Sequence, residues 1–252
     1  MTANLPPIPS TDLMRSRRLR KTRIALLVLA LAALAAVAVV FRQGLIPALY
    51  SPLPLIDLAV SPWFFVDWRL ASLRHDPEAC RRVLTPPGIA AAPVSDSPAK
   101  AGCGWTNGFR LSSAGGARIS IDPLSCEAAA AFALWMEHEV QPLAVSMFGH
   151  RVASVHHMGS YACRDIAGRR FLGVGRSEHA RANAIDVRGF TLDNGRQITI
   201  VKHWSGQGPE SEFLRSVHQR SCRYFRVSLG PEFNAAHRDH FHLDRGIFWT
   251  CR

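Results

Sequence analysis

The stretch that decides the fold is AIDVRGFTLDNGRQITIVKH, residues 184–203, in which two runs of strand-forming residues flank an Asp-Asn-Gly turn at 193–195. Asn-Gly between such runs is the strongest short-range signal for a β-hairpin, because both residues tolerate the positive φ that a tight turn needs. We therefore expect antiparallel strands at 184–190 and 196–203.

The segments around the hairpin predict helices and further short strands. Helices are expected at 76–84, at 128–139 with a continuation to 148 after Pro142, and at 211–224, and strands at 118–121, 226–229 and 241–243. The central helix has a typical N-cap in Ser125 and an acidic residue, Glu127, in its first turn. After the first helix we expect an irregular stretch up to Gly108. Helices followed by an antiparallel sheet with one interposed helix argue for the α+β class.

The N-terminal part has the pattern of a membrane anchor. Ile24 to Phe41 is an unbroken apolar run, close to the ~18 residues that a spanning helix needs, and six basic residues precede it within the first 23. By the positive-inside rule, the N-terminus stays in the cytoplasm and the rest is exported. A cleaved signal peptide is the alternative. Its apolar core is usually about 7–15 residues long and ends at small residues, whereas this run passes into Phe41-Arg42, so we favour the anchor.

The predicted organisation has four parts. These are a cytoplasmic basic segment at 1–23, a transmembrane helix at 24–42, a proline-containing spacer at 43–62 and an exported domain at 63–252. The aromatic residues directly after the spacer fit either of two roles, an interfacial group at the membrane surface or packing of the first domain helix. They are Trp63, Phe64, Phe65 and Trp68.

Composition and charge exclude several classes of protein. With 48% hydrophobic and 19% charged residues, the chain is too apolar for disorder and too mixed for a polytopic membrane protein. The net charge is +11, but the first 23 residues hold six basic residues against Asp12, which accounts for +5 of it. Since the excess is not concentrated on one folded surface, we expect no nucleic-acid partner.

All six cysteines follow the apolar run. An even number of cysteines in an exported domain predicts three disulfides. No Cys-x-x-Cys pair is present, which argues against a cysteine zinc site. The first pair that we expect is Cys80 with Cys103, because this bond would close the Pro/Ala-rich loop at 85–101.

Two short segments concentrate residues suited to metal chemistry. They are SEHARANAID at 177–186 and HRDHFHLD at 237–244. In a strand, His240 and His242 share one face, and spacing alone does not choose between them as ligands. Two imidazoles and a carboxylate from a neighbouring strand make a three-ligand zinc site with an open position. Such a site suits hydrolysis, because zinc lowers the pKa of bound water towards 7 and polarises a carbonyl.

These segments also resemble a known family. Tyr161-Ala162-Cys163-Arg164, the segment 177–186, and Gly230-Pro231 ahead of 237–244 resemble the bacterial extensin-like C-terminal family. The Ser-x-His-x-x-Gly-x-Ala-x-Asp pattern with a late His-x-His is similar to the zinc D-Ala-D-Ala peptidase superfamily, which includes D,D-carboxypeptidases, murein endopeptidases and the hedgehog signalling domain. The resemblance covers roughly Trp63 to Arg252. It implies an α+β fold with an antiparallel sheet of that superfamily's type and flanking helices.

The resemblance implies a zinc ion (Zn2+) held by His179, Asp186 and His242. Related peptidases place the general base either two or three residues before the last ligand, which here means His240 or Asp239. Strand geometry favours His240, because it shares a face with His242, while Asp239 would qualify from the preceding loop.

Arg164 aligns with an arginine that related enzymes use near the substrate carboxylate or the developing oxyanion, and its other interpretation is a surface arginine beside a disulfide. Ser177 is expected to cap a turn rather than to bond within the site. The usual glycine of the pattern is Ala182 here. If that position needs a positive φ, the alanine strains the loop, and if it only needs close packing, a methyl group is tolerated.

The function that follows is an inner-membrane-anchored, periplasmic zinc peptidase that hydrolyses peptide bonds in peptidoglycan stem peptides or cross-links. The alternative is a zinc-stabilised, non-catalytic domain that binds or scaffolds the cell wall, for which the hedgehog branch is a precedent.

Overall fold

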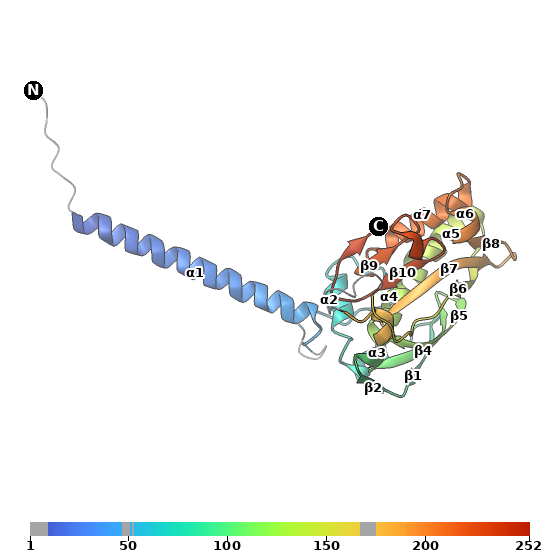
Figure 1. Ribbon diagram of the computed structural model, residues 1–252, viewed down its shortest axis with the longest axis horizontal. Coiled ribbons are helices and arrows are strands. Elements are labelled where there is room, and N and C mark those ends of the chain that lie inside the picture. The colour runs from blue at the N-terminus through green and yellow to red at the C-terminus, as the bar shows by residue number, and fades with distance from the viewer. Residues whose placement is uncertain (1–9, 47–50, 52, 167–174) are drawn as a thin grey trace, which may run out of the picture.

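The computed structural model describes residues 10–46, 51, 53–166 and 175–252. Residues 1–9 of the predicted cytoplasmic segment and 47–50 and 52 of the predicted spacer lie outside the described residues. A long helix, α1 (Ser10–Arg42), leads into the folded domain (Figure 1). It begins at Ser10, ahead of the basic cluster and well before the expected start at residue 24, and it includes the whole cluster because arginine and lysine are good helix formers.

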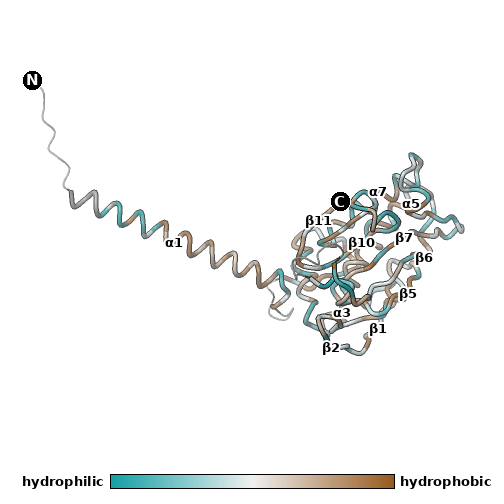
Figure 2. The backbone as a smooth tube through the Cα atoms, viewed as in Figure 1, coloured by the Kyte–Doolittle hydropathy of each residue, from teal (hydrophilic) through white to brown (hydrophobic). Residues whose placement is uncertain are grey.

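The segment of α1 from Arg17 to Arg42 is long and apolar enough to cross a membrane, and a signal sequence would pass the same test. Figure 2 shows hydrophilic residues along the first turns of α1 and hydrophobic ones along the rest. None of the most apolar window is buried against the domain.

The described residues form one nine-stranded sheet and one two-stranded sheet. In the large sheet, the order is β1-β4-β5-β6-β7-β10-β9-β11, with β8 paired to β7. Its strands are β1 (Ala90–Val94), β4 (Gly108–Ala114), β5 (Ala117–Ser125), β6 (Val152–His157), β7 (Ala184–Leu192), β8 (Gln197–Thr199), β9 (Val227–Leu229), β10 (Phe241–Asp244) and β11 (Thr250–Cys251). The pairs β5–β6 and β9–β11 are parallel, and the others are antiparallel. The expected α+β class with a mostly antiparallel sheet is confirmed.

The helices flank this sheet, and α4 lies at the centre of the core. They are α2 (Val66–Ala71), α3 (Pro77–Val83), α4 (Cys126–Trp135), the π-helical turn η2 (Met136–Val140), α5 (Gln141–Phe148), α6 (Ile200–His203), α7 (Pro209–Ser221) and the two 3₁₀ turns η3 (Glu178–Arg181) and η4 (Ala235–His237). Ser125 caps α4 as expected, since its hydroxyl accepts a hydrogen bond from Ala128 N at 3.3 Å. Every residue of α4 is buried, which explains its alanine-rich sequence.

The hairpin is present, but its second strand is shorter than expected. β8 ends at Thr199, and Ile200 already begins α6. His203 Nδ1 lies 3.0 Å from the backbone oxygen and 3.1 Å from the backbone nitrogen of Thr199. The His203 side chain thus closes the first turn of α6 onto the last residue of β8.

Residues 85–108 contain three strands that the expectation of an irregular stretch missed. β1 pairs with β4, while β2 (Ser97–Lys100) pairs with β3 (Cys103–Trp105). β1 lies at the end of the sheet order and includes Pro93, a residue that edge strands tolerate. Its pairing with a strand further along the chain, rather than its own pattern, makes it a strand.

All six cysteines are paired, which confirms three disulfides, but the predicted bond between Cys80 and Cys103 is wrong. The bonds join Cys80 to Cys126, Cys103 to Cys163 and Cys222 to Cys251. α3 packs on the start of α4, so Cys80 meets Cys126 in the core, and Cys103 is left to hold the segment that leads to the candidate site. The packing of α3 on α4, rather than the closure of a short loop, therefore determines the partner of Cys80.

The end of the predicted spacer packs into the domain. Ile56 and Leu58 are buried in the hydrophobic core, and the Arg69 guanidinium donates hydrogen bonds to the carbonyls of Pro54 and Leu55. The predicted boundaries of the four parts stay predictions.

Candidate metal centre

Two neighbouring strands, β7 and β10, position Asp186 and His242 of the candidate site. In the antiparallel pairing of β10 with β7, the Cα partner of His242 is Asp186. His179 comes from η3, one turn before β7, and Ser177 begins that turn by accepting a hydrogen bond from His179 N at 3.4 Å. Ser177 thus caps a turn, as expected. All three site residues are buried.

Three side-chain atoms converge at this point. His179 Nε2 lies 3.1 Å from Asp186 Oδ1 and 3.1 Å from His242 Nδ1, and His242 Nδ1 lies 3.0 Å from Asp186 Oδ1. Among the described residues, this is the one group of three or more His, Cys, Asp or Glu side chains placed to share a metal ion.

The outer nitrogens of the two histidines are held by acceptors. His179 Nδ1 donates to the carbonyl of Ser160 at 3.0 Å, and His242 Nε2 donates to Asp244 Oδ2 at 3.0 Å. Carbonyl and carboxylate oxygens only accept, so these outer nitrogens carry the protons. The inner nitrogens are then free to ligate a cation, an arrangement that metal sites use to orient their histidines. Two imidazole nitrogens and one carboxylate oxygen are a donor set that fits zinc.

A proton on His242 can neutralise the carboxylates of Asp186 and Asp244 in place of a metal ion. Burial alone would lower the pKa of His242, but hydrogen bonds with Asp186 and Asp244 raise it to about 9. Burial would likewise raise the pKa of Asp186, and the contacts with His179 and His242 instead hold it far below its usual range. The site is thus built around a positive charge, which a metal ion or a proton on His242 would supply.

The side chains of His240 and Asp239, the two candidates for a general base, contact each other. His240 Nδ1 lies 2.9 Å from Asp239 Oδ1, while His240 Nε2 lies 3.7 Å from Asp186 Oδ1. His240 is 7% exposed, so its imidazole stands at the edge of the triad with one nitrogen facing it. Asp239 lies on the far side of that ring, where its carboxylate can orient His240.

A cavity of about 930 Å³ opens beside these residues. Its lining includes His237, His240 and His242 on one side and the C-terminal segment 246–252 on another. Arg164 lines the same cavity. The six residues predicted for the site therefore lie in or directly beside one region of the molecule, with Arg164 in the wall of the cavity rather than in contact with the described triad.

The sequence interpretation gave no role to three groups that the structure places here. Asp244 could have been found, because two residues along a strand place it on the face of His242. His237 lies with its ring centroid 5.2 Å from that of His240, and burial lowers the pKa of His237 to about 4, so it is neutral at pH 7. The Ser160 carbonyl carries no sequence signal, because every residue has one.

Ala182 adopts the conformation that the glycine of the pattern would. Its φ is 52°, in the left-handed region, and it ends η3. Its carbonyl accepts a hydrogen bond from Ser125 N at 2.7 Å, which ties this turn to the start of α4. The position therefore needs a positive φ, and alanine there costs about 1–2 kcal/mol in backbone strain.

Comparisons with known proteins give one match. No curated protein and no protein of solved structure is detectably similar to the chain. The family model described as "Extensin-like protein C-terminus" matches residues 78–252, a range that includes all the residues of the candidate site. The match covers well over half of the 252 residues, and the chain therefore belongs to the extensin-like C-terminal family.

Proposed function

We propose that the protein is a zinc peptidase of the D-Ala-D-Ala peptidase superfamily, with that superfamily's fold, and that it hydrolyses peptide bonds in peptidoglycan stem peptides or cross-links. The observation that carries the proposal is the position of His240. A structural metal site is closed by its ligands, whereas a hydrolytic site also needs a proton acceptor within reach of the attacking water. His240 is such a group, since its Nε2 lies 3.7 Å from Asp186 Oδ1 without belonging to the triad.

His179, Asp186 and His242 would hold the zinc ion. When bound, zinc supplies a water of lowered pKa and a polarised substrate carbonyl. His240 Nε2 takes one proton from the attacking water and passes it to the leaving amine as the C–N bond breaks. Asp239 accepts a hydrogen bond from His240 Nδ1, which leaves the lone pair on Nε2.

The cavity suits an anionic peptide. Four arginines line it: Arg164, Arg176, Arg181 and Arg252. Arg176 is paired with Asp165 at 2.9 Å and Arg181 with Glu178 at 3.5 Å. Arg164 and Arg252 form no ion pair with any described residue, and of these two it is Arg164 whose charge helps to lower the pKa of His237, beside the candidate site. We therefore assign Arg164 the carboxylate of the stem peptide, as charge complementarity favours.

We further propose that α1 spans the inner membrane with its basic end in the cytoplasm and the domain in the periplasm. The apolar length of α1 and the basic residues before it support this orientation. Three disulfides fit an oxidising compartment.

The test uses the full chain in detergent, with zinc per chain measured by elemental analysis and cleavage of purified muropeptides followed by mass spectrometry. We expect about one zinc per chain and cleavage for the unchanged protein, neither for Asp186→Ala, and zinc without cleavage for His240→Ala. His156→Ala is the matched control, because that exposed imidazole contacts Thr191 on β7, outside the described triad. Folded protein without zinc would overturn the metal site. Zinc without cleavage would favour the non-catalytic binding domain, which co-sedimentation with peptidoglycan sacculi would then test.

A further inference from the structure

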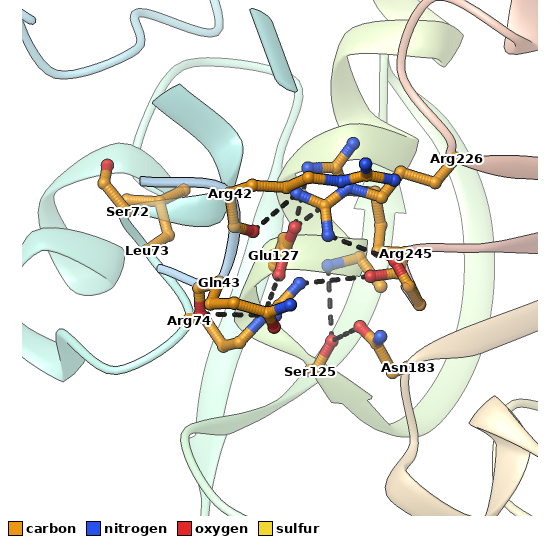
Figure 3. A network of polar contacts seen from close by, with 12 residues as sticks. Arg42, Gln43, Ser72, Leu73, Arg74, Ser125, Glu127, Asn183, Arg226 and Arg245 are labelled. Carbon is orange, nitrogen blue, oxygen red and sulfur yellow. Dashed lines mark hydrogen bonds and ion pairs between the residues drawn. The ribbon is translucent and has the colours of Figure 1, made fainter. Parts of the chain in front are cut away.

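The C-terminal end of α1 is held directly by the domain. Arg226 donates from Nη2 to the carbonyl of Arg42 at 2.8 Å, and Arg74 donates from Nη1 to the carbonyl of Gln43 at 3.3 Å (Figure 3). Both arginines are anchored in turn, Arg226 on Asp67 at 2.7 Å and Arg74 on Glu127 at 2.7 Å. The domain therefore contacts the end of the apolar helix directly, at residues 42 and 43.

Gly44 makes this close approach possible. Its φ is +68°, and a Cβ at this position would lie 2.2 Å from the carbonyl oxygen of Ala71. Only glycine lets the chain pass so near the end of α2. Gly44 N also donates to the carbonyl of Phe41 at 3.0 Å, which ends α1. α1 and α2 are thus packed together at a fixed position.

A continuous series of aromatic rings leads from the apolar helix onto the domain. Phe41, the last residue of the apolar run, stacks on Trp68 with ring centroids 5.4 Å apart. Trp68 stacks on Phe65 at 5.4 Å, Phe65 meets Phe64 at 5.7 Å, and Phe64 meets Trp63 at 4.6 Å. The contact of Phe41 with Trp68 ties this series of rings to the end of α1.

The C-terminal segment reaches the same end of α1. The Arg42 guanidinium lies 5.3 Å from the ring centroid of Trp249, and Arg42 Nη2 donates to the carbonyl of Ile247 at 2.9 Å. Trp63, 82% exposed, and Trp249, 56% exposed, are the most exposed tryptophans among the described residues. Trp249 therefore contacts the end of α1 directly, and Trp63, almost 190 residues earlier, is connected to the same end through the series of ring contacts.

We propose that these rings form a membrane-docking collar, by which the domain rests on the surface of the bilayer that α1 spans. The collar consists of Phe41, Trp63, Phe64, Phe65, Trp68 and Trp249. The inference rests on the proposed membrane span and is independent of peptidase activity.

The bilayer surface is the occupant that this position selects. Phe41 closes the apolar run and Arg42 follows it, so the rings beside them lie at the boundary between hydrocarbon and headgroups. Tryptophan is enriched at that boundary because one end of its ring system is apolar and the other donates a hydrogen bond. Arg42 lies where lipid phosphates are within reach.

Docking also positions the candidate site. Ile247 and Trp249 line the cavity that contains His240 and His242. One wall of the cavity would therefore lie at the membrane surface, and the cavity would take its peptide from that surface.

The test uses the full chain reconstituted in phosphatidylcholine–phosphatidylglycerol nanodiscs, with and without bromine atoms near the headgroup end of the acyl chains. Brominated lipid quenches tryptophan emission on contact, and α1 contains no tryptophan. We expect quenching in the unchanged protein and the loss of most of it in the double variant Trp63→Phe and Trp249→Phe. Trp204→Phe is the matched control and retains the quenching, because Trp204 directly follows α6, at the other end of the domain from α1 (Figure 1).

Equal quenching in the unchanged protein and the double variant, or none in either, would overturn the collar. Carbonate extraction of membranes tests separately whether α1 spans the membrane, so failure of the collar can be distinguished from failure of the anchor. Protein released by carbonate would show that α1 does not span, and the collar would fall with it. Protein retained by carbonate but insensitive to the two substitutions would overturn the collar alone.

Discussion

His242 stands directly opposite Asp186 in the pairing of β10 with β7, and His242 Nδ1 lies 3.0 Å from Asp186 Oδ1. Strand register alone determines this contact, because a slip of one residue would turn His242 to the other face of the sheet. His179 then needs only the short turn before β7 to complete the triad. The candidate metal site is therefore as rigid as the sheet that carries it.

Replacing Asp244 by asparagine should weaken metal binding without unfolding the protein. Asp244 accepts a hydrogen bond from His242 Nε2, and loss of such a supporting carboxylate typically lowers metal affinity about 10–100-fold. Competition with a chelating dye measures the affinity. Asp193→Asn is the matched control, because its exposed carboxylate contacts His150 away from the site. Equal affinities for the two variants would remove Asp244 from the site.

Replacing Arg164 by alanine should raise KM for an anionic stem peptide while leaving kcat nearly unchanged. A hydrogen bond to a charged group contributes about 1.5–3 kcal/mol, which corresponds to about a 10–100-fold change in binding. Steady-state kinetics on muropeptides measures both constants. Arg110→Ala serves as the control, since Arg110 pairs with Asp122 outside the cavity. A fall in kcat with constant KM would instead place Arg164 at the reacting carbonyl.

The buried carboxylate of Glu127 should make the domain sensitive to acid. Burial alone would raise the pKa of Glu127, but Arg245 and Arg74 hold it below its usual range. A depressed pKa in the folded state contributes stability above the unfolded pKa of about 4.3, and this stability is lost as pH falls through the folded value. We expect the thermal unfolding temperature of the full chain to fall steeply below about pH 4.

Glu127→Gln tests this interpretation. Removal of one partner of a buried ion pair destabilises by about 3–5 kcal/mol, and the variant should also lose part of the acid dependence. Glu78→Gln is the control, because the exposed pair of Glu78 with Arg81 is worth at most about 1 kcal/mol. A loss for Glu127→Gln no larger than the control's would show that the network contributes little.

Ala182 should tolerate glycine but not valine. Glycine relieves the strain of a φ of 52° and forfeits one buried methyl group, and the two effects nearly cancel. Valine is β-branched, so it adds strain at a fully buried position, and we expect it to destabilise by more than about 2 kcal/mol. Thermal unfolding of the two variants measures the difference. A stable valine variant would mean that the turn rearranges.

Gly44→Ala should loosen the junction between α1 and the domain. Its Cβ would collide with Ala71, whereas Gly149, which also has a positive φ, has nothing within 4 Å. Gly149→Ala therefore carries the backbone strain alone, about 1–2 kcal/mol. Limited proteolysis of the full chain should cut the Gly44 variant near residue 44 much faster than the Gly149 variant. Similar cleavage of both would show that α1 does not depend on this packing.

Local signals in the sequence determined several elements. The Asn-Gly turn and its flanking residues specify the hairpin, because turn geometry depends on neighbours in the chain. Ser125 specifies the start of α4 in the same way. The apolar run of α1 and the six cysteines after it were equally plain, and the histidines and Asp186 stood out by their density and by their resemblance to a family pattern.

Tertiary structure decided everything that depends on contact between distant residues. Spacing could not choose between His240 and His242, but the pairing of β10 with β7 brings His242 Nδ1 into the triad and leaves His240 beside it. The disulfide partners of Cys80 and Cys103 follow from helix packing rather than from loop length. Residues far apart in the chain meet only when the whole core is packed, since each contact needs the others to hold it in place.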